Sequence, residues 1–251
     1  MARRIKTLII LAYSLFLTVA NLHSQETVSV NFRVFGAGLD DFQDLFYFDR
    51  GDYIPLGFKK TSRSVNTYEY RGAPQITIFA ANPAHRTKPL ETPAFLPLAS
   101  LRINQSYPDS LLVFVANAKN RQKQKEKRSY KLFLLDDSPE AFKENTIYTI
   151  NATEIELYGK IGTETVILPS NSSQKSDFSQ FTSNNKPLPI RFAFLTPKGP
   201  RLTMSNDIPL SLNRRVVLVL MNPRREGSTR INTRALIDII SPLGDDDSES
   251  N

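Results

Sequence analysis

The chain lacks cysteine and tryptophan, and it has only two histidines, His23 and His85, among 251 residues. Without cysteine it has no disulfide framework, no thiolate metal site and no lipid-carrying cysteine. Serine nucleophiles usually need a histidine base, and His85 stands alone in a proline-rich stretch. The motifs Gly-x-Ser-x-Gly and His-Glu-x-x-His are also absent. We therefore expect a protein that is not an enzyme and that carries no metal or other cofactor.

Acidic side chains offer another route to metal binding or catalysis, and they occur in two clusters. Asp40, Asp41 and Asp44 precede the first expected hairpin, and Asp136 and Asp137 follow a late apolar run. Neither cluster has the Asp-x-Asp-x-Asp-Gly spacing of a calcium loop. Aspartate readily satisfies local backbone groups, so we interpret both clusters as turn residues and strand-end caps. A calcium site built from distant loops, or a glycosidase pair of carboxylates, stays open because only proximity in space defines it.

The N-terminus has the plan of a secretory signal peptide. A basic head over residues 3–6 precedes an apolar stretch from 8 to 20, which is too short to span a bilayer comfortably. Small residues favour cleavage after Ala20, with Ser24 as a second position and a retained N-terminal anchor as the alternative. We predict a signal peptide over residues 1–24 and an exported protein, either periplasmic or extracellular. Charges interrupt every later apolar run, so we expect no transmembrane span in the mature chain.

Alternating apolar residues indicate short β-strands along most of the remaining chain. In residues 28–34 every second residue is apolar, which is the period of a strand with one buried face. Residues 45–58 form two such segments around Asp49-Arg50-Gly51-Asp52, and this pattern predicts a hairpin with a tight turn. Turn chemistry also suffices to explain the Arg-Gly-Asp tripeptide, which serves cell adhesion in other settings. The continuous apolar run at 111–115 is typical of a strand buried on both faces.

The second half of the chain repeats the elements of the first half in the same order. The corresponding segments are 45–58 with 155–168, 76–83 with 190–197, 111–115 with 216–220, and 132–139 with 235–242. The spacing between partners drifts slowly, as insertions in loops would make it do. We interpret this as an internal duplication. One larger sandwich without a repeat is the alternative.

These patterns, together with 16 prolines, favour an all-β fold of two tandem antiparallel immunoglobulin-like β-sandwich domains with about seven strands each. We place the first domain at residues 25–137 and the second at residues 138–242. The best helix candidate is a turn or two at 138–143, where serine and proline begin the segment. Residues 243–251 are acidic and have no apolar residue after Leu243, which predicts a disordered tail.

Three segments resemble uncharacterised exported bacterial proteins with tandem β-sandwich domains. They are the hairpin at 45–56, the sequence Tyr68-Glu69-Tyr70-Arg71-Gly72, and the stretch 134–142. The resemblance covers most of the mature chain and implies the same fold and the same export. It implies no catalytic residue, cofactor or partner, because such proteins have no established chemistry to transfer.

A cationic loop is the sharpest candidate for a binding site. The formal net charge is +7, and a dense group of lysines and arginines lies between the apolar runs 111–115 and 132–135. Clustered cations attract polyanions by counterion release, so acidic polysaccharide, anionic lipid headgroups and DNA are candidate ligands. The interpretation we favour over anion binding is solubilising charge that also blocks edge pairing. The candidate anion-binding residues, including two in the matching connection of the second half, are Lys119, Arg121, Lys123, Lys125, Lys127, Arg128, Arg224 and Arg225.

The sequence leaves three functional hypotheses. The first is an exported, non-enzymatic protein of the cell envelope or extracellular space, a structural or interaction scaffold that uses its loops and edge strands. Its partner is unknown, with an anionic envelope polymer or another envelope protein as candidates. The second is anion binding through the basic loops. The third is a carbohydrate-binding or carbohydrate-active protein, for which Tyr47, Tyr53, Tyr68 and Tyr70 offer ring faces. We favour the interpretation that these are half-buried rings with solvated hydroxyls.

Overall fold

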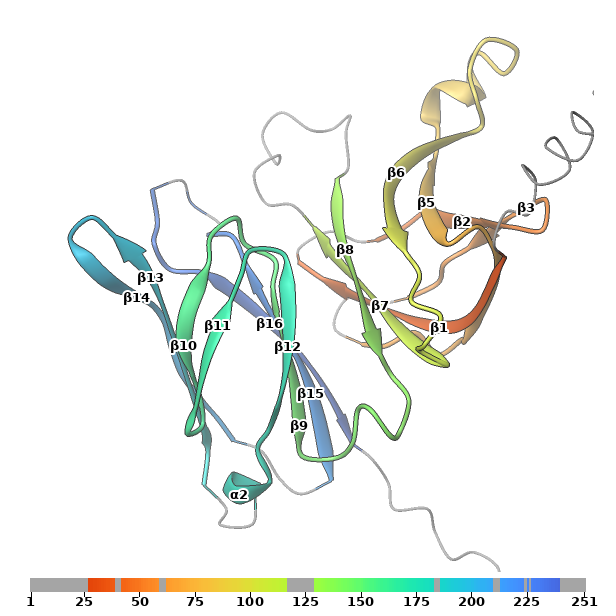
Figure 1. Ribbon diagram of the computed structural model, residues 1–251. Helices are drawn as coiled ribbons and strands as arrows, with labels where there is room; N and C mark the ends of the chain where they lie inside the picture. Colours follow the sequence, from red (N-terminus) through yellow and green to blue (C-terminus); the bar gives the residue numbers. More distant parts are fainter. Residues whose placement is uncertain are drawn as a thin grey trace, which may run out of the picture.

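The computed structural model describes residues 27–38, 42–58, 62–116, 129–182, 186–209, 213–223, 225 and 227–239. These residues form sixteen strands in four four-stranded sheets, which confirms the predicted all-β fold of two tandem β-sandwiches (Figure 1). The predicted signal peptide and acidic tail lie outside the described residues and stay predictions. Among the described residues, no helix has the length and apolar character needed to cross a membrane.

The first half of the chain forms two of the sheets. Its strands are β1 (Val28–Ala37), β2 (Leu45–Asp49), β3 (Asp52–Pro55), β4 (Tyr68–Gly72), β5 (Gln75–Ala81), β6 (Phe95–Arg102), β7 (Asp109–Ala116) and β8 (Tyr130–Asp136). One sheet has the order β4-β1-β7-β8 and the other has the order β3-β2-β5-β6. β1 and β7 run parallel, whereas the other neighbours in these sheets are antiparallel.

The second half forms the other two sheets. Its strands are β9 (Thr146–Asn151), β10 (Leu157–Ile161), β11 (Glu164–Leu168), β12 (Ser172–Asp177), β13 (Leu188–Thr196), β14 (Gly199–Ile208), β15 (Arg214–Met221) and β16 (Asn232–Ile239). The sheet orders are β12-β9-β15-β16 and β11-β10-β13-β14. β9 and β15 form the parallel pair here. Adding eight to each strand number of the first half therefore reproduces both sheets of the second half, parallel pair included.

This topology differs in two ways from the expectation. Each half has eight described strands, where about seven were expected by analogy with immunoglobulin-like domains. The first strand of each half also lies inside a sheet beside a parallel seventh strand, so one sheet of each half is mixed, whereas the other sheet is purely antiparallel. Alternation of apolar residues reports which side chains are buried, but it carries no information about the direction of the neighbouring strand.

The predicted hairpin of the first half is confirmed as β2 and β3, with a two-residue turn between the paired residues Asp49 and Asp52. Arg50 has φ 48° and Gly51 has φ 99°, and positive φ at both central residues is the signature of a type I′ turn. The guanidinium of Arg50 donates to the carboxylate of Asp49 at 2.8 Å. Turn geometry therefore accounts for the Arg-Gly-Asp sequence.

Helix is as scarce as expected. The described helical elements are the 3₁₀ turn η1 (Pro83–Arg86) and the single-turn helix α2 (Ser179–Thr182). The expected helix at 138–143 is only a turn, in which the amides of Ala141 and Phe142 both donate to the carbonyl oxygen of Ser138. This turn leads the chain from β8 of the first half to β9 of the second.

Each half has its own apolar core, and a third apolar cluster joins the two halves. Side chains from one face of β7, such as Leu112 and Phe114, lie in the first core, and the corresponding face of β15 lies in the second core. The opposite faces of the same two strands meet in the third cluster, which holds fourteen buried apolar residues: Phe35, Ala37, Leu111, Val113, Val115, Phe133, Leu135, Phe142, Ile150, Ala152, Val217, Val219, Met221 and Leu236. The prediction that 111–115 is buried on both faces is therefore confirmed, because the sheet β4-β1-β7-β8 packs against the sheet β12-β9-β15-β16 of the other half.

Candidate functional site

The structure describes one of the eight candidate anion-binding residues. Arg225 is exposed, in the connection between β15 and β16. Lys119, Arg121, Lys123, Lys125, Lys127, Arg128 and Arg224 lie outside the described residues. The two connections nevertheless join equivalent strands, because Ala116 pairs with Tyr130 across β7 and β8, and Met221 pairs with Asn232 across β15 and β16. Anion binding at these loops stays a prediction.

The aspartates of the two sequence clusters play different structural roles. Asp44 is exposed with φ 56°, a turn conformation, whereas Asp40 and Asp41 lie outside the described residues. Asp136 is a local cap as expected, since its Oδ1 accepts hydrogen bonds from the amide and hydroxyl of Ser138. For Asp137 the interpretation as a turn residue or cap is wrong. Its side chain is 1% exposed and is held by arginines from both halves.

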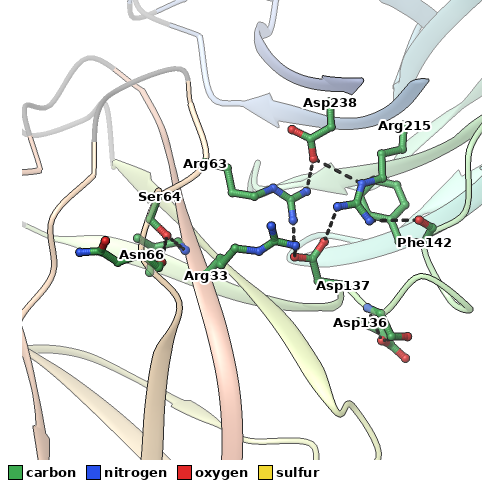
Figure 2. Close-up of polar contacts among 11 residues, drawn as sticks. Arg33, Arg63, Ser64, Asn66, Asp136, Asp137, Phe142, Arg215 and Asp238 are labelled. Carbon is green, nitrogen blue, oxygen red and sulfur yellow. Dashed lines mark hydrogen bonds and ion pairs between the residues drawn. The ribbon is translucent and has the colours of Figure 1, made fainter. Parts of the chain in front are cut away.

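Asp137 lies at the centre of an ion-pair network between the halves (Figure 2). Its Oδ2 accepts a hydrogen bond from Arg33 on β1 at 2.8 Å and another from Nη1 of Arg63, which precedes β4. From the second half, Nη2 of Arg215 on β15 lies 3.6 Å from Oδ1. One buried carboxylate therefore faces three guanidinium groups from three separate segments.

Asp238 on β16 is the second acid of the network. It accepts a hydrogen bond from Nη2 of Arg63, and Nε of Arg215 lies 3.4 Å from the same oxygen. Arg63 therefore bridges an aspartate of each half, and the side chain of Arg63 is only 9% exposed. We call Arg33, Arg63, Asp137, Arg215 and Asp238 the arginine–aspartate cluster.

Local contacts hold the two buried arginines in place. Ser64 exchanges two hydrogen bonds with Val34 of β1, and its hydroxyl also donates to the carbonyl of Asn66, so the backbone beside Arg63 is fixed on the sheet (Figure 2). Arg215 donates to the carbonyl oxygen of Phe142 at 3.2 Å, and its guanidinium carbon lies 4.9 Å from the centre of the Phe142 ring. The turn that follows β8 thus supplies both a hydrogen-bond acceptor and a cation–π partner.

The cluster is not electrically balanced. It contains three arginines and two aspartates, which leaves one positive charge in surplus. Burial lowers the pKa of Arg215, and the nearby charge of Arg63 lowers it further. Nε of Arg63, Nε of Arg215 and Oδ1 of Asp137 are buried without a hydrogen-bond partner among the described residues. Buried polar atoms without a partner are unusual and costly, so the ion pairs do not satisfy every polar atom of this contact.

A groove of about 960 Å³ opens beside the cluster, between the turn after β8 and the end of β16. Its charged lining residues are Arg33, Arg63, Arg215, Lys143, Asp238, Glu140 and Glu144, and its apolar lining residues include Ile237, Ile239 and the fully buried Phe142. A second, smaller pocket of about 210 Å³ shares Arg33, Pro139 and Arg215 with the groove and is also lined by Asp137. The cluster therefore borders two hollows, and the larger has the size of a small-molecule site.

The four candidate tyrosines do not form one surface. Tyr47, Tyr68 and Tyr70 are buried in the first core, and their hydroxyls donate to backbone carbonyls of Glu69, Gly57 and Ala73. The expectation of half-buried rings with solvated hydroxyls is wrong for these three, because the rings are buried and backbone carbonyls accept from their hydroxyls. Tyr53 alone lies on the outside, on β3.

Tyr53 belongs to an outer aromatic cluster on the sheet β3-β2-β5-β6. Its ring stacks on Phe95 at 3.9 Å and meets the rings of Phe48 and Phe79 edge-on at 5.1 Å each, and Phe46 contacts Phe95 at 4.9 Å. β3 and β6 are the two edges of this sheet, so the stacked pair indicates that its outer face is curled. Phe48 and Tyr53 remain 44% and 37% exposed. No local pattern in the sequence indicates this cluster, because its five rings come from four separate strands.

The remaining chemistry of the described residues is sparse. Nδ1 of His85 lies 2.8 Å from the carbonyl oxygen of Thr92, so this histidine belongs to the loop between β5 and β6. Within the described residues, no three histidine or acidic side chains lie close enough together to hold a metal ion. No protein-family model matches the sequence, and no curated protein is significantly similar to it. The arginine–aspartate cluster and its groove are therefore the best-defined candidate site.

Proposed function

We propose that the protein is an exported, non-enzymatic scaffold that holds two β-sandwiches in one fixed orientation. The observation that carries the proposal is the contact between the halves, where an apolar cluster of fourteen buried residues adjoins a buried ion-pair network. Two domains that move independently would not need such a contact, because their shared interface is ordinarily small and polar. A rigid pair of sandwiches instead presents its outer sheets and loops to partners at a constant spacing.

The absence of cysteine makes rigidity easy to measure. Ser100 on β6 and Ser205 on β14 are exposed on the two outer sheets, so Ser100→Cys together with Ser205→Cys adds the only two thiols for spin labels. We expect electron–electron distance measurements to give one narrow distribution that does not change with salt. Val217 is fully buried between the halves, so Val217→Asp serves as the comparison variant and should broaden the distribution. A broad distance distribution, or one with several peaks, in the protein with the unaltered interface would contradict the proposal of a rigid scaffold.

Export is tested separately through residues 1–24. Fused to a reporter enzyme that is active only outside the cytoplasm, this segment should give activity in a bacterial host. A matched fusion with Leu11→Arg breaks the apolar stretch and should give none. If both fusions are inactive, the protein acts inside the cell and the proposal of export is wrong.

A second candidate function is carbohydrate binding at the outer aromatic cluster. The exposed rings of Phe48 and Tyr53 support it, because aromatic faces in a curled sheet offer an apolar platform next to polar turn residues. Binding to a panel of insoluble polysaccharides should then fall in Phe48→Ala. Ile167→Ala, which changes an exposed apolar side chain on β11, should leave binding unchanged. Equal binding of both variants would exclude this surface.

A further inference from the structure

The two halves differ at one edge of their sandwiches. In the first half, the edge strands β6 and β8 lie against each other and close the sandwich. Four leucines of these strands are partly buried against the first core, and they are Leu98, Leu101, Leu132 and Leu134. In the second half, β14 and β16 are the corresponding edges, but among the described residues they do not run in contact along their lengths. Thr203 of β14 is hydrogen-bonded to the backbone of Thr229 and Ile231, just before β16. Beyond this point the edge of the second sandwich is open.

A β-bulge at the same place in both halves shows which residues of β6 and β14 correspond. The bulge follows residue 78 of β5 in the first half and residue 192 of β13 in the second. Two residues before it, Ile76 pairs with Leu101 of β6, and Ile190 pairs with Asn206 of β14. Ile76 and Ile190 are buried in the two cores, so Leu101 and Asn206 both face inward. Leu101 is partly buried, whereas Asn206 is exposed, so β14 lacks an apolar side chain with which β6 closes the first sandwich.

β16 keeps apolar side chains on the face that this opening uncovers. Ala235 and Ile237 pair with Leu218 and Val216, which are buried in the second core, so both face inward. Ile239 lies two residues further along the same face of the strand. All three side chains are nevertheless exposed, and Ile237 and Ile239 are 40% and 67% exposed. Aliphatic side chains that face inward at an uncovered sheet edge form a surface to which another element can bind.

We propose that an extended segment of a partner chain adds to this edge as a β-strand. The segment lies alongside β14, as a fifth strand of the sheet β11-β10-β13-β14. The inward side chains of this segment, apolar at every second position, cover Ile237 and Ile239.

Two observations favour a peptide strand over a lipid or a sugar. Among the described residues, no strand pairs with the outer edge of β14 or of β16, and the backbone groups of a sheet edge pair with an extended peptide. The first half also shows which kind of element covers this inward face, because β6 lies against β8 there. The partner strand would therefore supply the second sandwich with the cover that the first has within its own chain.

A synthetic peptide with the sequence of β6, residues 95–102, is the probe. Fluorescence anisotropy should detect binding of the labelled peptide to the full chain. A peptide with serine in place of Leu98 and Leu101 should bind about ten-fold more weakly, because it lacks the apolar side chains that cover the edge. Failure of the original peptide to bind, or equal binding of the serine peptide, would overturn the proposal.

Backbone methylation distinguishes strand addition from a purely apolar contact. Successive N–H groups of a strand point to opposite sides, so only one alternate set faces β14. Of two peptides, each methylated on one alternate set of backbone nitrogens, one should bind about ten-fold more weakly and the other should bind as before. Equal binding of the two methylated peptides would contradict strand addition.

Protein variants and hydrogen exchange locate the site. Ile239→Asp should weaken binding of the β6 peptide about ten-fold. Ile167→Asp, at a position 55% exposed on the opposite edge strand β11, should leave it unchanged. Bound peptide should also slow amide exchange within residues 199–208, and thermal unfolding checks that both variants are folded. Binding that ignores Ile239→Asp in a folded protein, or protection confined to the first half, would place the peptide elsewhere.

A second copy of the chain is the competing occupant of the edge. Sedimentation of the unaltered protein without peptide should show a monomer. A dimer that Ile239→Asp dissociates would show that the edge pairs with another copy, and it would overturn the proposal of a different partner. The edge belongs to the second half alone, so these outcomes do not depend on the contact between the halves that carries the scaffold proposal.

Discussion

Replacing Asp137 with asparagine removes one charge from the centre of the molecule without changing the shape of the side chain. The cluster then contains three arginines and one aspartate. Arg33 loses the carboxylate it contacts, and Arg63 and Arg215 keep only Asp238. The Asp137 side chain is 1% exposed, so water does not reach this position to solvate the guanidinium groups that have lost their partner. Breaking a buried ion pair from one side typically costs about 3–5 kcal/mol, and we expect Asp137→Asn to lie in this range.

Urea unfolding followed by circular dichroism measures the effect. With a slope of about 2 kcal/mol per molar urea, the midpoint should fall by about 2 M. The neighbouring change Asp136→Asn is the control, because Asp136 only accepts local hydrogen bonds from Ser138, and an asparagine oxygen accepts them too. The control should cost less than about 1 kcal/mol. If the two variants unfold at the same urea concentration, Asp137 does not hold the halves together.

A double mutant distinguishes two causes of destabilisation: the loss of the ion pairs of Asp137 and the repulsion among arginines left without a carboxylate. Arg63→Gln in the Asp137→Asn background returns the cluster to one surplus charge, since Arg33, Arg215 and Asp238 remain. The double variant should therefore cost at least about 1 kcal/mol less than the sum of the two single variants. If the changes in unfolding free energy simply add, Asp137 and Arg63 contribute to stability independently and their ion pair contributes no coupling energy.

Three further predictions concern other parts of the molecule. Gly51→Ala, at φ 99° with open space around it, should cost about 1–2 kcal/mol in urea unfolding, and Gly162→Ala should cost more, because its new methyl group would also meet a phenylalanine ring at 2.4 Å. Burial raises the pKa of Tyr148 to about 12, so its contribution to stability is complete below pH 10 and is lost as the pH rises from 10 to 12; Tyr148→Phe should show a smaller loss of stability over that interval. Binding to an acidic polysaccharide, if the basic loop provides it, should weaken steeply with salt and should fall on neutralising Lys123, Lys125 and Lys127.

The strands themselves were largely predictable, because burial of one face imposes a two-residue period that the sequence displays openly. The turn at Gly51 was predictable for a different reason, since few residues tolerate its positive φ. The repeat was visible as well, but one correspondence needs a correction of a single residue. Leu111 faces the other half, whereas Val216 faces its own core, so the structural counterpart of Leu111 is Val217. A shift of one residue exchanges the two faces of a strand.

The arginine–aspartate cluster had no comparable signal. Arg63 and Asp238 are 175 positions apart in the chain, and no local pattern connects them. Asp137 sits next to Asp136 at the end of a strand, and both have the appearance of caps in the sequence. Only the tertiary arrangement distinguishes the aspartate that binds its own turn from the aspartate that binds three arginines. The outer aromatic cluster is similar, since its rings come from strands that the sequence does not place side by side.

One feature of the sequence did point to the contact between the halves. A two-layer sandwich buries one face of each sheet, so a strand that is apolar on both faces requires a third layer. The runs 111–115 and 216–220 both have this property, and β7 and β15 cover each other's second face. The apolar part of the contact uses the same strands from both halves, as in a symmetric dimer of one sandwich. The polar part does not, because two arginines and one aspartate of the first half meet one arginine and one aspartate of the second. Apolar packing alone would permit sliding, and the asymmetric ion pairs favour a single alignment, which is the property that a rigid scaffold needs.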